Sequence, residues 1–182
     1  QVAAWCKQQQ ISWHEFPQFG VVRALKNRNL WQAAWEKHMA LPIEEIQDIR
    51  FWKPASALPL SMTAPSHLHH NPPLRQRGGR PLSLASLNSF LKARSIGYRG
   101  GISSPLSATS ACSRLSPYLS WGCLSVREVV QTCQCAWGAL PPGRHRDGLR
   151  ALVGRLAWRD HFTQKLETQP DMEWCNLHRG YN

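Results

Sequence analysis

The C-terminal half of the chain carries a helical apolar pattern, and no other feature of the sequence restricts the possible folds as strongly. Leu84, Leu87, Phe90 and Leu91 recur at intervals that place their side chains on one face of a helix. Residues 146–167 continue such spacing over a length that is typical of a long helix. We therefore predict that the chain is all-α from residue 83 onward and mainly α as a whole.

Polar caps indicate where these helices begin. Ser83 is predicted to cap the first of them, because a Ser oxygen accepts hydrogen bonds from the N–H groups that a helix start leaves free. Ser125 is predicted to cap a second helix, with Glu128 at the spacing of a capping box. Residues 96–110 are rich in Gly and Ser and are predicted to form a turn, and residues 113–119 open a further helix.

Residues 1–40 begin with a short helical pattern and continue with an alternating one. Residues 2–7 have the composition of a helix end. Residues 11–16 alternate apolar and polar side chains, as a half-buried strand does, and Pro17 and Gly20 then interrupt the pattern. A helix followed by a strand is typical of the trailing edge of an α/β domain, so we predict that residues 1–40 end such a domain.

A second helix is predicted just before residue 40. Asn29 is a suitable cap for a helix over residues 30–40, and Pro42 closes it. Trp31 and Trp35 lie four residues apart and therefore share one face. We interpret this pair as packing against the core rather than as a functional pair.

The middle of the chain is predicted to be a linker. Residues 54–82 are rich in Pro, Ser, His and Gly, and the prolines interrupt any regular element. We therefore place an interdomain linker over residues 41–82. His67, His69 and His70 lie in it, but no carboxylate or Cys accompanies them at helical spacing, so we predict no metal site.

The charge balance favours polyanionic partners. The chain has 182 residues, with 22 Lys and Arg against 11 Asp and Glu, which gives a formal net charge of +11. A basic surface attracts phosphate backbones, so nucleic acid is the favoured partner class. No apolar run reaches the roughly 18 residues that a membrane-spanning helix requires. The six cysteines are scattered without metal-ligand spacing, which favours reduced thiols and predicts a cytoplasmic location.

Residues 102–119 form the segment that is richest in hydroxyl groups, a loop that leads into a predicted helix start. Hydroxyls, free N–H groups and Arg114 at such a place suit a phosphate or a pyrophosphate. Composition by itself favours the simpler alternative, a well-capped helix without a ligand. The segment also lacks the glycine order of a P-loop or a dinucleotide-binding turn.

The late helix carries a second candidate group of residues. Arg155 and Arg159 are i, i+4 neighbours, and so are Trp158 and Phe162. Like charges on one helix face repel one another unless an anion or an acid lies between them. A Trp beside two such arginines suits stacking on a nucleobase or a flavin ring.

The same helix places Asp160 next to His161, which are residue types of an acid–base pair. Adjacent residues on a helix point in different directions, so these two side chains do not face one another. We therefore predict structural roles for both of them.

Two long motifs in the chain resemble those of the photolyases and cryptochromes. Ser113-Arg-Leu-Ser-Pro-Tyr-Leu-Ser-Trp-Gly122 with the following Leu124-Ser-Val-Arg-Glu128 is similar to the family signature SRLSPYLxxGxLSxRE. Arg155-Leu-Ala-Trp-Arg-Asp-His-Phe162 is similar to the family segment ELIWREF. Tyr98 stands ahead of the signature as the family's flavin-phosphate Tyr does, and residues 17–26 resemble a bacterial cryptochrome-like branch. The resemblance covers nearly the whole chain.

This resemblance implies a fold and an activity. Residues 83–182 would be the first half of a helical FAD-binding domain, preceded by the trailing edge of an α/β antenna domain and a long linker. The implied activity is light-driven, FAD-dependent repair of pyrimidine dimers in DNA by a photolyase, a carbon–carbon lyase that acts on a dimer flipped out of the duplex. The resemblance further implies an internal segment of a longer protein, and we expect a monomer without membrane association.

The resemblance also assigns roles to individual residues. Trp158 matches the Trp that stacks at the lesion pocket and is the predicted catalytic residue. Arg155 and Trp158 are the predicted DNA contacts. The predicted FAD-binding residues, which match the family's phosphate, ribityl and flavin-side positions, are Tyr98, Ser113, Leu115, Ser116 and Arg159.

Two departures from the family pattern keep alternatives open. Cys112 stands where the family has a Thr, and Arg155 stands where it has the lesion-recognising Glu. The second departure favours a cryptochrome-type blue-light photoreceptor, which binds FAD without repairing DNA. A third interpretation is a helical nucleic-acid-binding protein without a cofactor, which would bind DNA with a steep salt dependence and show no flavin absorbance.

Overall fold

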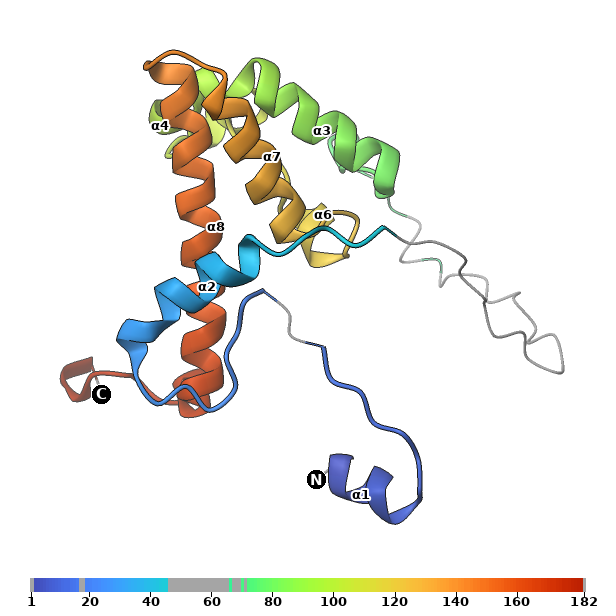
Figure 1. Ribbon diagram of the computed structural model, residues 1–182. Helices are drawn as coiled ribbons and strands as arrows, with labels where there is room; N and C mark the ends of the chain where they lie inside the picture. Colours follow the sequence, from blue (N-terminus) through green and yellow to red (C-terminus); the bar gives the residue numbers. More distant parts are fainter. Residues whose placement is uncertain (1, 17–18, 46–65, 67–69, 71, 182) are drawn as a thin grey trace, which may run out of the picture.

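The computed structural model describes residues 2–16, 19–45, 66, 70 and 72–181. Over these residues the chain is mainly helical and contains no strand, which confirms the predicted fold class (Figure 1). In the same part of the chain, no helix combines the length and apolar character needed to cross a membrane. Three sequence predictions fall outside the described residues: the break at Pro17, the histidines His67 and His69, and most of the linker.

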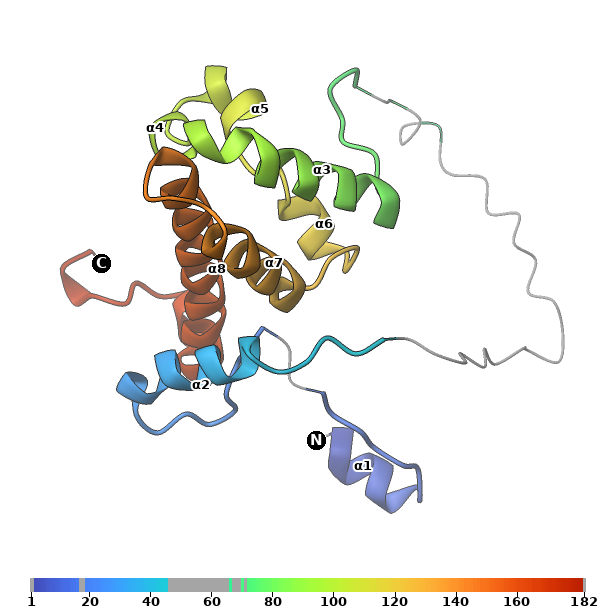
Figure 2. The same cartoon turned by 45° about the horizontal axis from the view of Figure 1, so that its top comes forward.

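Three helices form the centre of the fold. They are α3 (Arg80–Lys92), α7 (Val126–Gly138) and α8 (Arg144–Thr168). Figure 2 shows α7 running beside α8 with α3 above them, and the short α6 (Ser116–Ser120) lies next to α7. The predicted long helix is therefore confirmed as α8, and the helix expected over residues 113–119 begins later, at the first residue of α6.

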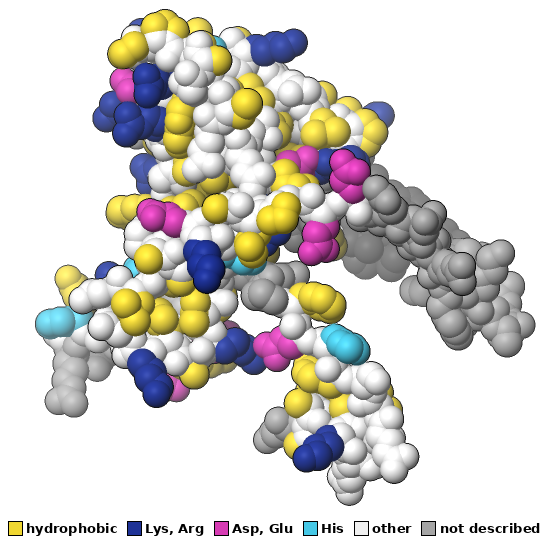
Figure 3. Space-filling view, viewed as in Figure 1, with side chains coloured by type: hydrophobic (Ala, Val, Ile, Leu, Met, Phe, Trp, Pro, Cys, Tyr) yellow, Lys and Arg dark blue, Asp and Glu magenta, His cyan; other side chains and the backbone are white. Residues whose placement is uncertain are grey.

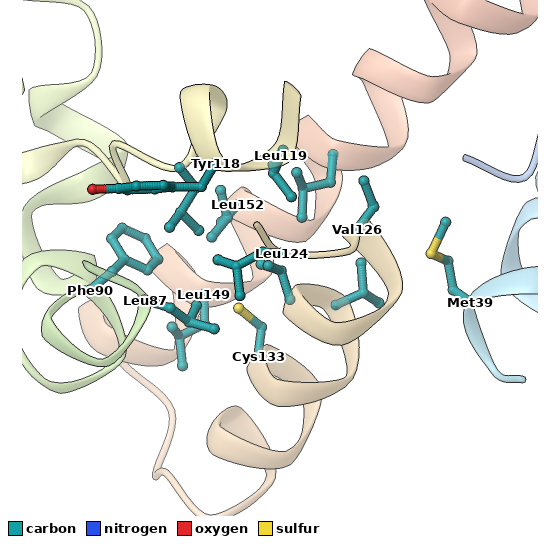
Figure 4. Packing of buried hydrophobic residues seen from close by; sticks show 14 of the residues in the cluster. Met39, Leu87, Phe90, Tyr118, Leu119, Leu124, Val126, Cys133, Leu149 and Leu152 are labelled. Carbon is teal, nitrogen blue, oxygen red and sulfur yellow. The ribbon is translucent and has the colours of Figure 1, made fainter. Parts of the chain in front are cut away.

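The core lies where these helices meet (Figure 4). Leu87 and Phe90 of α3, Leu149 of α8 and Leu124 before α7 are at most 2% exposed. Burial of each such side chain stabilises the folded chain by about 1.5–3 kcal/mol relative to leaving it in water. Tyr118 packs its ring on the same cluster while its hydroxyl points to the edge and donates to the carbonyl oxygen of Arg77 at 3.0 Å.

The second predicted helix is present, but its start differs from the prediction. A 3₁₀ turn, η1 (Arg28–Leu30), precedes α2 (Trp31–Met39). The residue that caps this start is Asn27, whose side chain accepts from the N–H of Asn29 at 2.9 Å, so the prediction of Asn29 as the cap is wrong. The extra 3₁₀ turn moves the free N–H groups two residues earlier, where only Asn27 can reach them.

The tryptophans of α2 pack into the core, as predicted. Trp31 and Trp35 are 5% and 4% exposed, and their rings lie 6.2 Å apart. Met39 of the same helix is also buried and joins the cluster that α7 and α8 form. α2 is thus packed on the helical core rather than on a sheet within the described part of the chain.

The strand predicted over residues 11–16 is absent. After α1 (Val2–Gln8), this segment is coil, and Ile11, Trp13 and Phe16 are about half exposed or more. In both views α1 lies apart from the other helices (Figures 1 and 2). The prediction failed because alternation makes a strand only when a neighbouring strand pairs its N–H and C=O groups, and none of the described residues supplies one.

The other two predicted caps, Ser125 and Ser83, had opposite outcomes. Ser125 caps α7 as predicted, since its side chain accepts from the N–H of Glu128 at 3.0 Å. The prediction of Ser83 as a cap is wrong, because α3 begins three residues earlier, after Gly79. Pro81 fits the first turn of α3, where a missing N–H has no cost, and the buried Ser83 hydroxyl donates to the carbonyl oxygen of Arg80 at 2.7 Å.

The segment predicted as a turn over residues 96–110 contains several short helices. They are η3 (Arg94–Gly97), α4 (Tyr98–Gly101), η4 (Pro105–Ser107) and α5 (Ala108–Ala111). These segments are only three or four residues long and contain Gly, Ser and Pro, so local sequence gives a weak helical signal. Tertiary packing of η3 and α4 against α8 holds the helical turns in place.

The cysteines of α7 provide a direct test of the helix's orientation. Cys133 is fully buried and burial raises its pKa to about 12, whereas Cys135, two residues later, is exposed. Because the thiolate is the reactive form, we expect a maleimide or disulfide reagent to modify Cys135 rapidly in the folded protein and Cys133 only after unfolding. Peptide mass spectrometry after timed labelling measures both rates. Equal rates at the two positions in the folded protein would contradict this orientation of α7.

Candidate functional site

A pocket of about 530 Å³ lies between α4, the loop that leads into α6, and α8. We call it the Tyr98 pocket. Five of the seven residues predicted as site residues line it. These five are Tyr98, Ser113, Leu115, Ser116 and Arg155. The structure therefore brings the hydroxyl-rich loop and the late helix together at one place.

The loop that forms one wall of the pocket has an unusual backbone. Arg114 has a φ of 56°, the left-handed region that costs a non-glycine residue about 1 kcal/mol or more. Two side chains hold this conformation by bonding its carbonyl groups. Arg94 donates to the carbonyl oxygen of Cys112, and Gln76 donates to that of Arg114 at 2.9 Å. The strained loop is thus fixed from both sides.

Arg94 also ties the loop to α3. Its guanidinium donates to the carbonyl oxygen of Ser86 at 2.6 Å and to the hydroxyl of Ser89 at 3.1 Å. Burial lowers the pKa of Arg94, and the positive charge of Arg114 lowers it further. Two arginines therefore lie close enough to repel one another behind this wall of the pocket, and Arg114 of this pair lines the pocket itself.

Four residues that line the pocket carry donors without a hydrogen-bond acceptor among the described residues. Within the described part of the chain, the hydroxyls of Ser113 and Ser116 and the guanidinium groups of Arg114 and Arg155 form no hydrogen bond or ion pair with one another or with other side chains. No Asp or Glu is among the described residues that line the pocket. Unpaired donors and unneutralised cations at a concave place are the groups that bind a phosphate or pyrophosphate.

Tyr98 lines the pocket with a buried side chain. It is 6% exposed, and its ring meets that of Phe90 edge to face at 5.2 Å. Burial raises the pKa of Tyr98, and the nearby charge of Arg155 only partly offsets this rise. The phenol therefore stays protonated at neutral pH and offers its O–H as a donor.

Trp158 lies beside the pocket rather than in it. Its side chain is 62% exposed, and the guanidinium carbon of Arg155 lies 5.9 Å from its ring centroid. Arg155 therefore borders both the Tyr98 pocket and the exposed ring of Trp158. The two predicted DNA contacts are neighbours on the outer face of α8.

Arg159 lies one turn beyond Arg155 on α8 and is not among the residues that line the Tyr98 pocket. Its guanidinium donates to Oδ1 of Asp160 at 2.8 Å and stacks 4.3 Å from the ring centroid of Phe19. This predicted flavin contact thus holds the N-terminal segment against α8 in the described chain. Its role toward a flavin stays a prediction.

Sequence reasoning missed the central position of Asp160. This carboxylate is fully buried, and its Oδ2 accepts from the indole N–H of Trp35 at 2.9 Å while Oδ1 pairs with Arg159. Burial raises its pKa, and the bonds from Trp35 and Arg159 oppose this effect. Asp160 therefore has the structural role that we predicted. Its partner Trp35 lies 125 positions earlier in the chain, so no local sequence pattern indicates this pair.

The pocket also includes Gln76, which the sequence analysis did not select and which comes from the segment that precedes α3. Arg114, which the sequence analysis proposed as a phosphate contact, lines it from inside the signature. The left-handed backbone at Arg114 is invisible in the sequence, because Arg rarely adopts it. Gln76 lies among loop residues, and only the fold brings it to the pocket.

Comparison with known proteins gives two relatives. The chain is 26% identical over 125 residues to a deoxyribodipyrimidine photo-lyase of Halobacterium salinarum, a match that covers 69% of this chain and 22% of the relative. It is 34% identical over 102 residues to a deoxyribodipyrimidine photo-lyase of Streptomyces griseus, covering 55% of this chain and 20% of the relative. The matches thus span about a fifth of the length of these relatives. No family model matches the chain, and no solved structure matches it at a significant level.

Proposed function

We propose that this chain is a segment of an FAD-dependent photolyase that repairs pyrimidine dimers in DNA under light. The similarity to two relatives named photo-lyase supports a photolyase-family function. In this proposal residues 1–40 end the antenna domain, residues 41–82 form the linker, and residues 83–182 begin the FAD-binding domain. DNA as the partner, a monomeric state and a cytoplasmic location belong to the same proposal.

The single observation that carries the proposal is the Tyr98 pocket. Ser113, Ser116, Arg114 and Arg155 present donors to it that no described side chain satisfies. These residues would hold the phosphates of FAD, and Tyr98 would donate its phenol O–H. When bound, FAD supplies the light-absorbing, electron-donating group of the family's reaction.

Trp158 and Arg155 are the residues that would meet DNA. An exposed indole ring with a guanidinium 5.9 Å from its centroid offers stacking for a base and charge for a phosphate. A base can reach this ring only after it has left the stack of the duplex, which is the condition for repair of a dimer. The net charge of +11 supports association with DNA.

A cryptochrome-type photoreceptor is the second candidate, and one observation favours it. Arg155 stands where the family that this chain resembles has a Glu that recognises the lesion. In this structure Arg155 lines the Tyr98 pocket, where the phosphates of FAD would bind. A cation there suits the flavin phosphates better than it suits a carboxylate-dependent contact to a lesion. Repair of a dimer-containing oligonucleotide under blue light by the full-length protein separates the two candidates.

Titration of the chain with FAD tests the pocket. We expect Arg155→Gln and Ser116→Ala each to weaken FAD binding about tenfold or more, since a hydrogen bond to a charged group contributes about 1.5–3 kcal/mol. Quenching of flavin fluorescence measures the affinity. Arg150→Gln is the matched control, because Arg150 is an exposed arginine of the same helix outside the pocket.

Two results would contradict the assignment of the cofactor. One is equal FAD affinity for the Arg155 and Arg150 variants, since general charge attraction then explains the binding. The other is a folded wild-type chain that shows no binding of FAD at all.

A further inference from the structure

A second hollow lies on the other side of Trp158, between η1, α2 and α8. It measures about 480 Å³. We call it the Arg28 hollow. The side chains that matter for its chemistry are Arg28, Trp31, Trp158, His161, Phe162 and Lys165.

The hollow gathers positive charge without a counter-charge. Arg28 and Lys165 reach it from two different elements, and no Asp or Glu is among its described lining residues. Burial lowers the pKa of His161, and the charges of Arg28 and Lys165 lower it further, so the imidazole between them is neutral at pH 7. Two cations at one hollow repel one another, and an anion that binds between them turns this repulsion into attraction.

One residue that lines the hollow carries a buried donor without an acceptor among the described residues. Trp31 is 5% exposed, and its indole N–H has no hydrogen-bond partner in the described part of the chain. A buried donor that loses water without gaining a partner destabilises the fold. This N–H is closed off from the hollow, so the hollow's own donors to a ligand are the cations Arg28 and Lys165.

The rim of the hollow is aromatic and exposed. Trp158 and Phe162 are 62% and 51% exposed and meet edge to face with ring centroids 6.2 Å apart. The ammonium of Lys165 lies 5.6 Å from the centroid of Phe162. Aromatic rings that alternate with cations bind unpaired bases and their phosphates, whereas the bases of a duplex are already stacked on one another.

We propose that the Arg28 hollow binds a phosphodiester of single-stranded nucleic acid, held between Arg28 and Lys165, with a neighbouring base stacked on Phe162. This site deepens the proposed function and rests on its assignment of DNA as the partner. It adds contacts from η1 and from the next two turns of α8, where Phe162 lies about 6 Å and Lys165 about 10 Å along the helix axis from Trp158. A strand that leaves Trp158 would therefore continue toward α2.

The test compares two double variants with the same loss of charge. Arg28→Gln with Lys165→Gln removes the cations of the hollow. Arg144→Gln with Arg150→Gln removes two exposed arginines from the other end of α8, where Lys and Arg side chains also gather (Figure 3). Fluorescence anisotropy of a labelled octathymidylate measures the affinity of each chain at several salt concentrations, without FAD.

We expect the hollow double variant to bind the oligonucleotide on the order of tenfold more weakly, and its salt slope to fall by about 1.4, for two phosphate contacts of about 0.7 each. The control pair should keep most of the affinity and the slope. Phe162→Leu should weaken binding several-fold without changing the slope, because it removes a stacking face and no charge.

Three outcomes would overturn the inference. Equal losses in the two double variants indicate general charge attraction. Unchanged binding in the hollow variant places the strand elsewhere. Tighter binding of a duplex than of the single strand removes the role of the exposed rings. FAD titration of the same samples keeps the two proposals apart, since Arg28 and Lys165 lie outside the Tyr98 pocket and their loss should leave FAD affinity unchanged.

Discussion

Replacement of Gly148 by Ala is expected to lower the free energy of unfolding by about 3 kcal/mol or more, at the upper end of the cost of overpacking. A Cβ at this position of α8 would lie 1.8 Å from the carbonyl oxygen of Ser95 and 2.7 Å from its carbonyl carbon. These are backbone atoms of η3, so a side-chain rotation cannot relieve the contact. The whole of η3 would have to move away from α8.

The same displacement should damage the Tyr98 pocket, because η3 runs directly into α4, which begins at Tyr98. We therefore expect Gly148→Ala to weaken FAD binding as well as to destabilise the fold. Urea unfolding followed by circular dichroism measures the stability, and flavin fluorescence measures the binding.

Gly154 offers a matched control on the same helix. Nothing lies within 4 Å of a Cβ built there, so Gly154→Ala should stabilise α8 by about 0.5–1 kcal/mol through helix propensity alone. A similar change in stability for both variants would show that α8 and η3 do not approach as closely as described.

Removal of the Asp160 carboxylate is the second change with a large expected effect. Asp160→Ala should lower the free energy of unfolding by about 3 kcal/mol, because it leaves the indole N–H of Trp35 buried without an acceptor and takes the partner from Arg159. It also opens a space at a fully buried position. Thermal and urea unfolding measure the loss.

A double-mutant cycle isolates the contact across α2 and α8. In a Trp35→Phe background the indole N–H is already absent, so Asp160→Ala should cost clearly less than it does in the wild type. Asp171→Ala, at an exposed carboxylate beyond α8, is the control and should change stability little. Additive losses in the cycle would mean that the two side chains act independently.

The pH dependence follows from the direction of the pKa shift at Asp160. Burial raises its pKa above the ordinary value of 3.8, so the folded chain holds this proton more tightly than the unfolded chain does. The resulting stabilisation is fully present below the unfolded pKa and is lost as pH rises through the folded pKa. The stability of the wild type relative to Asp160→Asn should therefore increase as pH falls from about 7 to about 4, as urea unfolding at each pH measures.

Gly148 and Asp160 both determine how α8 contacts a neighbouring element. Gly148 brings α8 onto η3 and so fixes the wall of the Tyr98 pocket, whereas Asp160, three turns later, fixes α2 and so the wall of the Arg28 hollow. α8 carries both sites because its successive turns face different neighbours. A loss at either position is thus expected to disturb one site more than the other.

The sequence determined the helical class, the extent of α8 and the cap of α7. It did so because helical spacing and a Ser N-cap are local signals, which a helix satisfies within its own residues. The carboxylate of Glu128 does not complete the capping box and pairs instead with Arg80 of α3. It also identified Tyr98, Ser113, Leu115, Ser116 and Arg155, which share one pocket, through motifs written in consecutive residues.

Only the tertiary structure decided what depends on residues far apart in the chain. The alternating segment at residues 11–16 forms no strand because no partner strand stands beside it among the described residues, and residues 96–110 form helical turns because α8 packs against them. The left-handed backbone of Arg114, the bond from Trp35 to Asp160 and the placement of Arg159 against Phe19 have the same origin. Local spacing predicts on which face of a helix a side chain lies. Which residue it contacts depends on which helices pack together, and burial of the whole core decides that packing.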